Sequence, residues 1–330
     1  MKIRVIVVVL TILFGEQLQA SDAATRGQEL IEQASKKMNI FELPSFRMNA
    51  DVHVDNFGKP LDGKYSLLWN GPGQWREEVM FPGYSEIQVG NKGTNYLSRS
   101  TSQMLYRVFQ LHSALGFGSV GLPRTSFVNQ GLPAGETIKA VHQKTLGGQK
   151  ADCVEIIMES KHPREVCVDP KTGVLSRTGQ HLVDSDFFAV SEKLFPRSLV
   201  LEQEGKRVVE VHVTELKTSE QFQSTLFQPL QDSMSRQGCM NPTPGPKLKE
   251  VVPVYPSQDK MSRNQGMVGI YAIIDENGAP KELQKVMSAS PGLDKSATDA
   301  IGKWRYAPAT CDGKPIAIET VIEISYTLQY

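Results

Sequence analysis

Short alternating segments, separated by glycine and proline turns, fill most of the sequence between Phe41 and Leu216 and limit the folds open to it. Turns such as Asn70-Gly71-Pro72-Gly73 and Pro82-Gly83 divide one segment from the next. Strands at this spacing predict one large antiparallel sheet. The expected strands are Met48–Val54, Tyr65–Trp69, Gln74–Phe81, Ser85–Val89, Thr94–Ser98, Cys153–Met158, Val166–Asp169, Val174–Thr178, Ser198–Glu202 and Val208–Leu216.

Two helices are predicted beside these strands. Ser21–Asn39 places apolar residues at helical spacing and has Lys36-Lys37 near its end. Met104–Leu115 forms a second helix, inserted between two groups of strands. The order of these elements resembles the LolA family of periplasmic lipoprotein carriers: a helix, hairpins, an inserted helix and further hairpins. The resemblance also rests on the stretch Trp69–Arg76 and the turn Pro82-Gly83-Tyr84. The resemblance implies an α+β fold with an incomplete antiparallel barrel, and a lipid or lipoprotein acyl chain as ligand.

The last eighty residues predict a second, smaller sheet. Apolar and polar residues alternate from Ile316 to Leu328, as in a half-buried antiparallel strand. Met267–Asp275 is expected to form a hairpin through Asn277-Gly278, and a helical stripe runs from Leu293 to Trp304. About three strands with a helix on one face result. A sheet this small must leave an edge exposed, which an extended peptide can join.

The order of these motifs resembles the C-terminal domain of the TonB family. It includes Tyr255-Pro256, Gln265-Gly266, the run Trp304–Ala309 and Cys311–Pro315. The resemblance implies strand addition, in which the last strand pairs with a short N-terminal peptide of an outer-membrane receptor. It points to the following partner-binding residues: Tyr255, Pro256, Ile318, Glu319, Val321, Glu323 and Ser325. A second interpretation of Glu319 and Glu323 is protection of the edge against aggregation.

A proline-rich connector separates the two predicted domains. Residues 229–249 contain Asn241-Pro242-Thr243-Pro244-Gly245-Pro246, which disfavours helix and sheet. Even fully extended, the connector would span only about 70 Å at roughly 3.5 Å per residue, much less than the long reach of TonB itself. The expected organisation is a signal peptide at 1–20, a LolA-like domain at 21–228, this connector, and a TonB C-terminal domain at 250–330.

The first twenty residues have the pattern of a secretory signal. Lys2 and Arg4 precede an apolar run from Val5 to Gly15, and Leu18-Gln19-Ala20 suits a cleavage site. We therefore expect the protein in the periplasm. The alternative is that the segment stays uncleaved and anchors the chain in the inner membrane.

Four cysteines fit an oxidising compartment. Cys153 and Cys167 lie on two strands joined by the turn Ser160–Pro163, so a hairpin would place them opposite each other and predicts a disulfide. By exclusion, Cys239 pairs with Cys311. The rival interpretation is a zinc site of four cysteines, but the chain lacks the paired Cys-x-x-Cys spacing typical of such sites.

Charge and motif content exclude several classes of function. Lysine plus arginine and aspartate plus glutamate number 36 each, so no basic field attracts nucleic acid. None of the six histidines has metal-ligand spacing or lies beside a nucleophile motif. Gly116–Gly121 spells G-x-G-x-x-G, but no βαβ pattern surrounds it, so a loop is expected. The sequence predicts no enzyme, no metal and no cofactor.

Together these patterns predict a periplasmic binding or transport accessory protein. Its C-terminal domain would bind an outer-membrane receptor or another envelope protein by strand addition. Two alternatives stay open. One is a lipid or lipoprotein carrier that uses a cavity in the N-terminal domain, and the other is self-association through the exposed edge strand.

Overall fold

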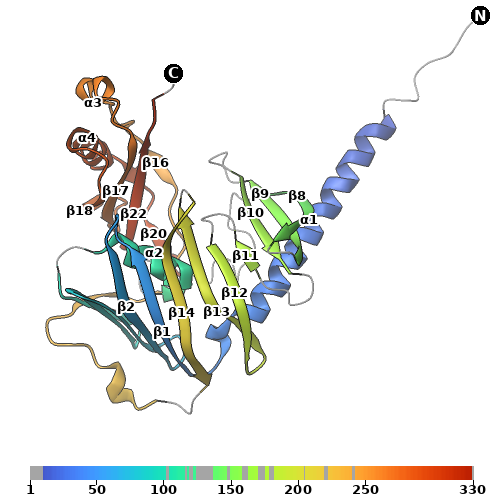
Figure 1. The fold of residues 1–330 in the computed structure, drawn as a ribbon, viewed down its shortest axis with the longest axis horizontal. Helices are drawn as coiled ribbons and strands as arrows, with labels where there is room; N and C mark the ends of the chain where they lie inside the picture. Colours follow the sequence, from blue (N-terminus) through green and yellow to red (C-terminus); the bar gives the residue numbers. More distant parts are fainter. Residues whose placement is uncertain are drawn as a thin grey trace, which may run out of the picture. The chain divides into compact units, whose positions relative to one another are not determined.

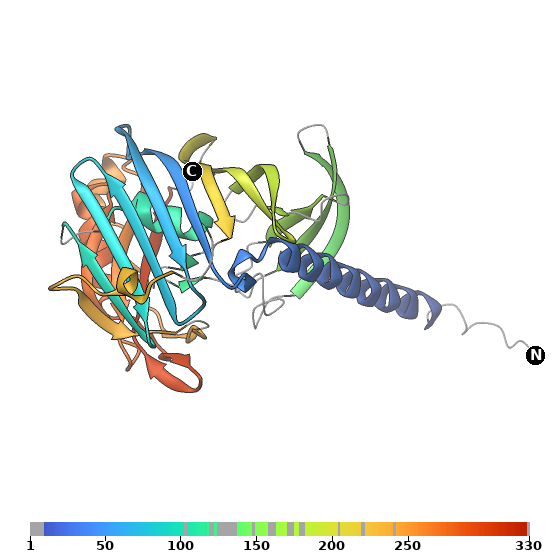
Figure 2. The ribbon, with the colours of Figure 1, turned by 90° about the horizontal axis from the view of Figure 1, so that it is seen from below.

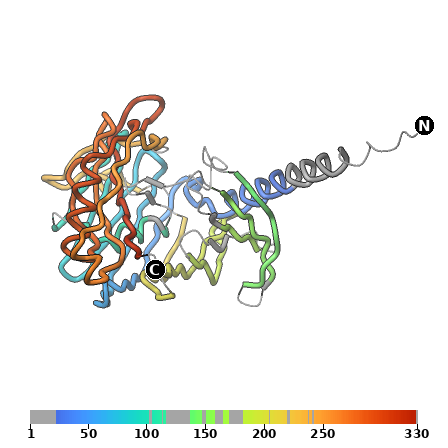
Figure 3. Tube along the Cα trace, turned by 90° about the horizontal axis from the view of Figure 1, so that it is seen from above, coloured from blue at the N-terminus to red at the C-terminus, as the bar shows by residue number. Residues whose placement is uncertain are grey.

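The structure is a computed structural model with two compact units. Unit 1 comprises residues 1–42 and 125–212, and unit 2 comprises residues 43–124 and 213–330. The residues whose secondary structure it describes are 10–101, 104–115, 117–118, 122–123, 137–146, 149–157, 163–169, 175–177, 182–203, 205–218, 222–239 and 242–328, and Figure 3 traces the backbone of the chain. The prediction of a mixed α and β chain with mostly antiparallel sheets is confirmed.

Unit 1 is a curved sheet with a long helix against it (Figure 2). The helix α1 (Leu10–Met38) begins inside the expected signal segment rather than at Ser21, and η1 (Ile40–Glu42) follows it. Ile31 and Ala34 of α1 pack on Val154, Ile156 and Val166. The strand order is β13-β12-β11-β10-β9-β8, with bounds β8 (Thr137–Leu146), β9 (Gln149–Ile157), β10 (Pro163–Val168), β11 (Leu175–Arg177), β12 (Leu182–Val190) and β13 (Lys193–Gln203).

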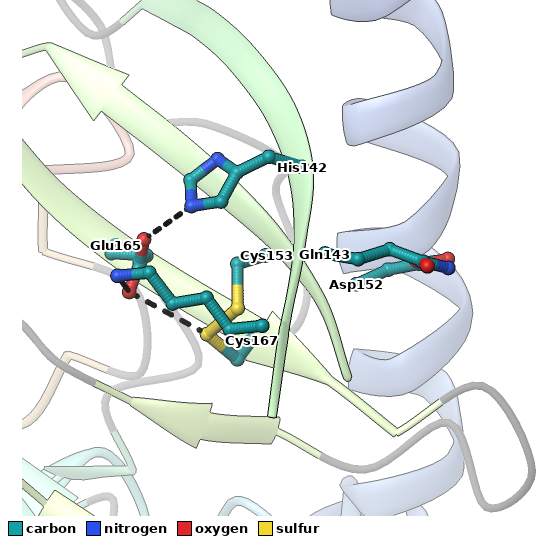
Figure 4. Close-up of a disulfide and its surroundings, with 7 residues drawn as sticks. His142, Gln143, Asp152, Cys153, Glu165 and Cys167 are labelled. Atoms are coloured by element: carbon teal, nitrogen blue, oxygen red, sulfur yellow. Dashed lines mark hydrogen bonds and ion pairs between the residues drawn. A yellow bond between two sulfur atoms is a disulfide. The ribbon is translucent and has the colours of Figure 1, made fainter. Parts of the chain in front are cut away.

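Both predicted disulfides are confirmed. Cys153 and Cys167 face each other in the register of β9 and β10, and a second bond joins Cys239 to Cys311. Figure 4 shows the first bond with the Glu165 carboxylate beside it, 2.8 Å from Nε2 of His142. The predicted turn at Ser160–Pro163 falls mostly outside the described residues.

The first part of unit 2 is the sheet that the glycine and proline turns predicted. Its strand order is β15-β5-β4-β3-β2-β1. Alternate residues of β1, such as Met48, Ala50 and Val52, are buried on one face. The residues 213–218 of β14 (Lys206–Thr218) lie beside β1, while its earlier residues pair with β13 in unit 1. The remaining bounds are β1 (Phe46–Asp55), β2 (Pro60–Trp69), β3 (Gln74–Phe81), β4 (Tyr84–Asn91), β5 (Thr94–Arg99) and β15 (Met234–Gln237).

The helix α2 (Tyr106–Leu115) lies against this sheet with Val108, Leu111 and His112 buried. The short strands β6 (Phe117–Gly118) and β7 (Leu122–Pro123) pair after it, and η3 (Ser224–Phe227) follows β14. The other residues of the predicted loop Gly116–Gly121 lie outside the described set.

The second part of unit 2 is the predicted small sheet with a helix on one face (Figure 1). The order is β18-β17-β22, and α4 (Pro291–Ile301) packs Leu293, Ala297 and Ile301 on it. The helix starts where the Ser290 Oγ accepts a hydrogen bond of 3.2 Å from the Leu293 amide. The bounds are β16 (Lys247–Lys249), α3 (Ser257–Met261), β17 (Gly266–Ile274), β18 (Pro280–Met287), β19 (Arg305–Tyr306), β20 (Ala309–Cys311), β21 (Lys314–Ile316) and β22 (Ile318–Tyr326).

The segment predicted as an unstructured connector carries structure of its own. Its β15 pairs with β5, and its β16 pairs with β19. Thr243 forms an isolated bridge with Thr310, and Cys239 is bonded to Cys311. Residues 229–249 therefore fasten the C-terminal sheet to the rest of unit 2. Among the described helices, none is long and apolar enough to cross a membrane.

Candidate partner-binding edge

The last strand, β22, forms an open edge of the C-terminal sheet. All nine of its residues pair with β17 in an uninterrupted antiparallel register from Ile318–Ile274 to Tyr326–Gly266. No other described strand pairs with β22. Because alternate residues of a strand turn their N–H and C=O groups to opposite sides, about half of these residues direct theirs away from β17. The predicted exposed edge is therefore present.

The opposite edge, β18, is built differently. Its pairing with β17 has two register shifts, and it begins at Pro280, which has no amide hydrogen. Lys281, Glu282 and Lys285 are exposed along it, and Glu282 has a φ of 50°. Bulges, prolines and lysines are the devices that prevent an edge from accepting a further strand. Of the two edges, only β22 has an unbroken register.

One face of β22 belongs to the core under α4. Ile322 and Tyr326 are buried there, and Ile318 and Ile324 pack against them. The Tyr326 hydroxyl donates a hydrogen bond of 3.3 Å to the Leu293 carbonyl of α4. These contacts pack one face of β22 against α4.

The other face was predicted to point outward, but the first part of unit 2 covers much of it. Tyr271 and Ile273 of β17 pack on Met104, with Phe109 of α2 nearby. Glu319 is 3% exposed and forms an ion pair with Arg236 of β15. The sequence pattern missed this contact because a glutamate at an alternating polar position is typical of a solvent-facing site. Glu319 can offer a partner only its backbone.

Glu319 ends a chain of buried charged side chains that starts under α2. Arg99 lies 3.8 Å from Glu319 and 2.6 Å from Glu86. Nε2 of His112 lies 3.9 Å from Glu86 and 3.6 Å from Glu77. Carboxyl groups and basic side chains alternate along the whole chain. The described residues between α2 and strands β3 to β5 therefore include a network of charged groups set among buried apolar side chains such as Trp75 and Val79.

Burial and pairing shift the pKa values of the two inner glutamates in opposite directions. Burial raises the pKa of Glu77 and outweighs the nearby His112. Burial would also raise the pKa of Glu86, but Arg99 and His112 outweigh it and hold the pKa of Glu86 below its usual value.

The remaining predicted strand residues are more accessible. Val321 is half-buried, and Glu323 and Ser325 are exposed. The Glu323 carboxylate accepts a hydrogen bond from the Tyr106 hydroxyl at the start of α2.

Tyr255 and Pro256 lie at the end of the same strand. The Tyr255 ring meets the Tyr326 ring edge-on with centroids 5.4 Å apart, and its hydroxyl donates to the Asn264 carbonyl. Pro256 caps α3. The structure thus brings Tyr255 to β22, as a packing residue of the core, while Val252 and Val254 just before it are 79% and 75% exposed.

Among the described residues, one cluster has metal-ligand geometry: Cys153, Glu165 and Cys167. Its two sulfur atoms are joined in the disulfide and offer no thiolate to an ion. The disulfide bond therefore accounts for the short distance between the two sulfur atoms of this cluster.

The sheet β18-β17-β22 and the helix α4 form a small α+β domain with one open edge strand. Residues 251–328 match the family model for the C-terminal domain of Gram-negative bacterial TonB proteins. The chain thus carries a TonB C-terminal domain.

Solved structures resemble the chain over a larger part of its length. A DUF1329 family protein from Desulfovibrio piger has 9% identity and a TM-score of 0.42 over 62% of this chain and 97% of its own. A LolA superfamily protein from Nitrosomonas europaea has 12% identity and a TM-score of 0.37 over the same shares. A MucA/MucB complex from Pseudomonas aeruginosa has 13% identity and a TM-score of 0.29 over 71% of this chain and 72% of its own. No curated protein matches the chain.

Proposed function

We propose that this chain is an envelope accessory protein that binds an extended segment of a partner protein, such as an outer-membrane receptor, along the free edge of β22. The unbroken nine-residue register of β22, beside the protected edge of β18, carries the proposal. A strand that joins β22 gains backbone hydrogen bonds, each worth about 0.5–1.5 kcal/mol net.

The edge is held in place before a partner arrives. The core under α4 fixes one face of β22, and the pairing of Glu319 with Arg236 and Arg99 fixes the other. A preformed strand loses little conformational entropy when a second strand joins it. Because the C-terminal sheet packs against α2, a partner that binds β22 would contact this sheet together with the first part of unit 2.

A pair of adjacent proline variants tests edge pairing in the full chain. Thr320 and Val321 are both half-buried, and consecutive residues direct their amides to opposite sides of the strand. Of the variants Thr320→Pro and Val321→Pro, one loses an amide that hydrogen-bonds to β17. The other loses only an amide that points away from β17. Immobilised wild-type chain should enrich peptides from a random nine-residue display library. The proline variant whose circular dichroism and Tm match those of the wild type should enrich none.

A second variant keeps the test decisive if both prolines unfold the sheet. Val321→Lys retains every backbone amide and adds a charge of the kind that protects natural edges. It should fold and lose peptide enrichment, whereas Lys281→Gln on β18 should enrich peptides as the wild type does. Enrichment by folded Val321→Lys at the wild-type level, or no enrichment by the wild type, contradicts the proposal.

The alternative of a lipid or lipoprotein carrier has less support in unit 2. Glu77, Glu86 and Arg99 lie where a carrier would need apolar lining beneath α2. Mass spectrometry of lipids that co-purify with the full chain distinguishes the two functions, because a carrier would retain stoichiometric lipid.

A further inference from the structure

The two glutamates on one face of β22 have different surroundings. Glu319 is buried between Arg236 and Arg99. Glu323, four residues later on the same face, is exposed, and no described lysine, arginine or histidine lies within ion-pair distance of it. Its carboxylate accepts a hydrogen bond from the Tyr106 hydroxyl. The carboxylate is thus oriented but has no cationic partner within the described chain.

Tyr106 is itself well fixed. It is 2% exposed and begins α2, where the Gln110 Nε2 donates to its hydroxyl at 3.2 Å. Its ring stacks with those of Phe57 and Phe109, at centroid distances of 6.2 Å and 6.4 Å. The residue that orients Glu323 therefore belongs to the first part of unit 2, outside the TonB C-terminal domain.

We infer that this edge selects a partner strand with a lysine or arginine opposite Glu323 and apolar residues on either side of that cation. This inference rests on the proposed function. A strand added to β22 places one residue directly across from Glu323, with Cβ atoms about 5 Å apart, and opposite charges at such a position attract. The neighbouring residues of the partner would lie on the other face, beside Ile322 and Ile324 of the core.

The composition of β22 argues against a second copy of the chain as the occupant. Its sequence, Ile-Glu-Thr-Val-Ile-Glu-Ile-Ser-Tyr, contains no basic residue. Two β22 strands paired with each other would therefore offer no cation to the Glu323 carboxylate of either copy. A different protein with a basic residue satisfies the edge better than self-association does.

The same nine-residue display library, selected on the full chain, tests this inference. Peptides enriched on the wild type should share a lysine or arginine at one position of an alternating apolar pattern. On Glu323→Lys, aspartate or glutamate should replace that cation, while Glu282→Lys on β18 should select the wild-type pattern. In an enriched peptide, replacement of the basic residue by norleucine should weaken binding to the wild-type chain up to about fivefold. The same replacement should not change the affinity of the peptide for the Glu323→Gln chain.

Tyr106→Phe tests the positioning role. It should reduce the preference for the lysine peptide over the norleucine peptide and leave the affinity for the norleucine peptide intact. Enriched peptides that require the β22 edge but show no basic position would overturn this inference and leave strand addition standing. Failure to enrich any peptide would overturn the proposed function itself. A selection pattern unchanged by Glu323→Lys would also reject the inference.

Discussion

Glu319 of β22 forms an ion pair with Arg236 of β15, so the last strand of the C-terminal sheet is fastened to the edge strand of the first sheet in unit 2. The two residues are 83 positions apart in the sequence. Arg99, on the neighbouring strand β5, is the second cation near this carboxylate.

Replacement of Glu319 should destabilise unit 2 strongly. Glu319→Gln leaves the Arg236 guanidinium without its carboxylate partner, while Arg99 keeps Glu86, and breaking a buried ion pair costs about 3 kcal/mol or more. Denaturant unfolding should show this loss, whereas the exposed Glu323→Gln should change the free energy of unfolding by less than about 1 kcal/mol. Equal stability of both variants would show that the pairing is not energetically important.

The two disulfides should differ in their contribution to stability. Cys239–Cys311 spans 72 residues and Cys153–Cys167 spans 14. Loop-closure entropy predicts losses of about 4 and about 3 kcal/mol when each pair is changed to serine. Tm measurements on the two double variants test this order, and a larger loss from Cys153→Ser/Cys167→Ser would contradict it.

Gly278 should tolerate no side chain. It has a φ of 76°, and an added Cβ would lie 1.8 Å from the Tyr306 carbonyl oxygen. Gly278→Ala should cost at least about 2 kcal/mol of unfolding free energy. Gly313, with a φ of 77° and open space around it, is the matched control, and alanine there should cost only about 1 kcal/mol.

Acid should weaken the C-terminal sheet through Asp294. Burial would raise the pKa of Asp294, but hydrogen bonds from Lys285, Ser288 and the Ala289 amide outweigh it and lower the pKa. A group with a depressed pKa contributes stability above its unfolded value, and this stability is lost as pH falls through the folded value. The free energy of unfolding should therefore fall below about pH 4, with a smaller slope in Asp294→Asn. Identical slopes would show that this carboxyl group does not contribute.

Local signals predicted the elements whose turns and periods are regular. The strand β3 has the predicted bounds, Gln74–Phe81, because glycine-containing turns flank it. The hairpin at Asn277-Gly278 forms as predicted, with the Gly278 amide donating to the Asp275 carbonyl at 2.8 Å. The Tyr255 ring packs on Tyr326 at the end of β22, while the shared role of Tyr255 and β22 in partner binding stays a prediction.

Irregular strands were missed because a bulge breaks the alternation of period two. The register of β8 against β9 shifts between Ile138 and Ala140. In β12, Asp186 has a φ of 53° and leaves one pair out of an otherwise constant register with β13. The burial of Glu319 could not be predicted either. It depends on Arg236, which lies in a segment that looked structureless and gains its strand only by pairing with β5.

The Cys239–Cys311 bond gives the molecule a route for mechanical tension. Cys311 lies seven residues before β22, and Cys239 lies two residues after β15. A pull on a strand joined to β22 would thus pass through a covalent bond to the chain beside β15, the edge strand of the first sheet in unit 2, and would bypass the proline-containing segment between the two sheets. A partner strand bound at β22 would then be linked to that sheet by a disulfide as well as by the main chain.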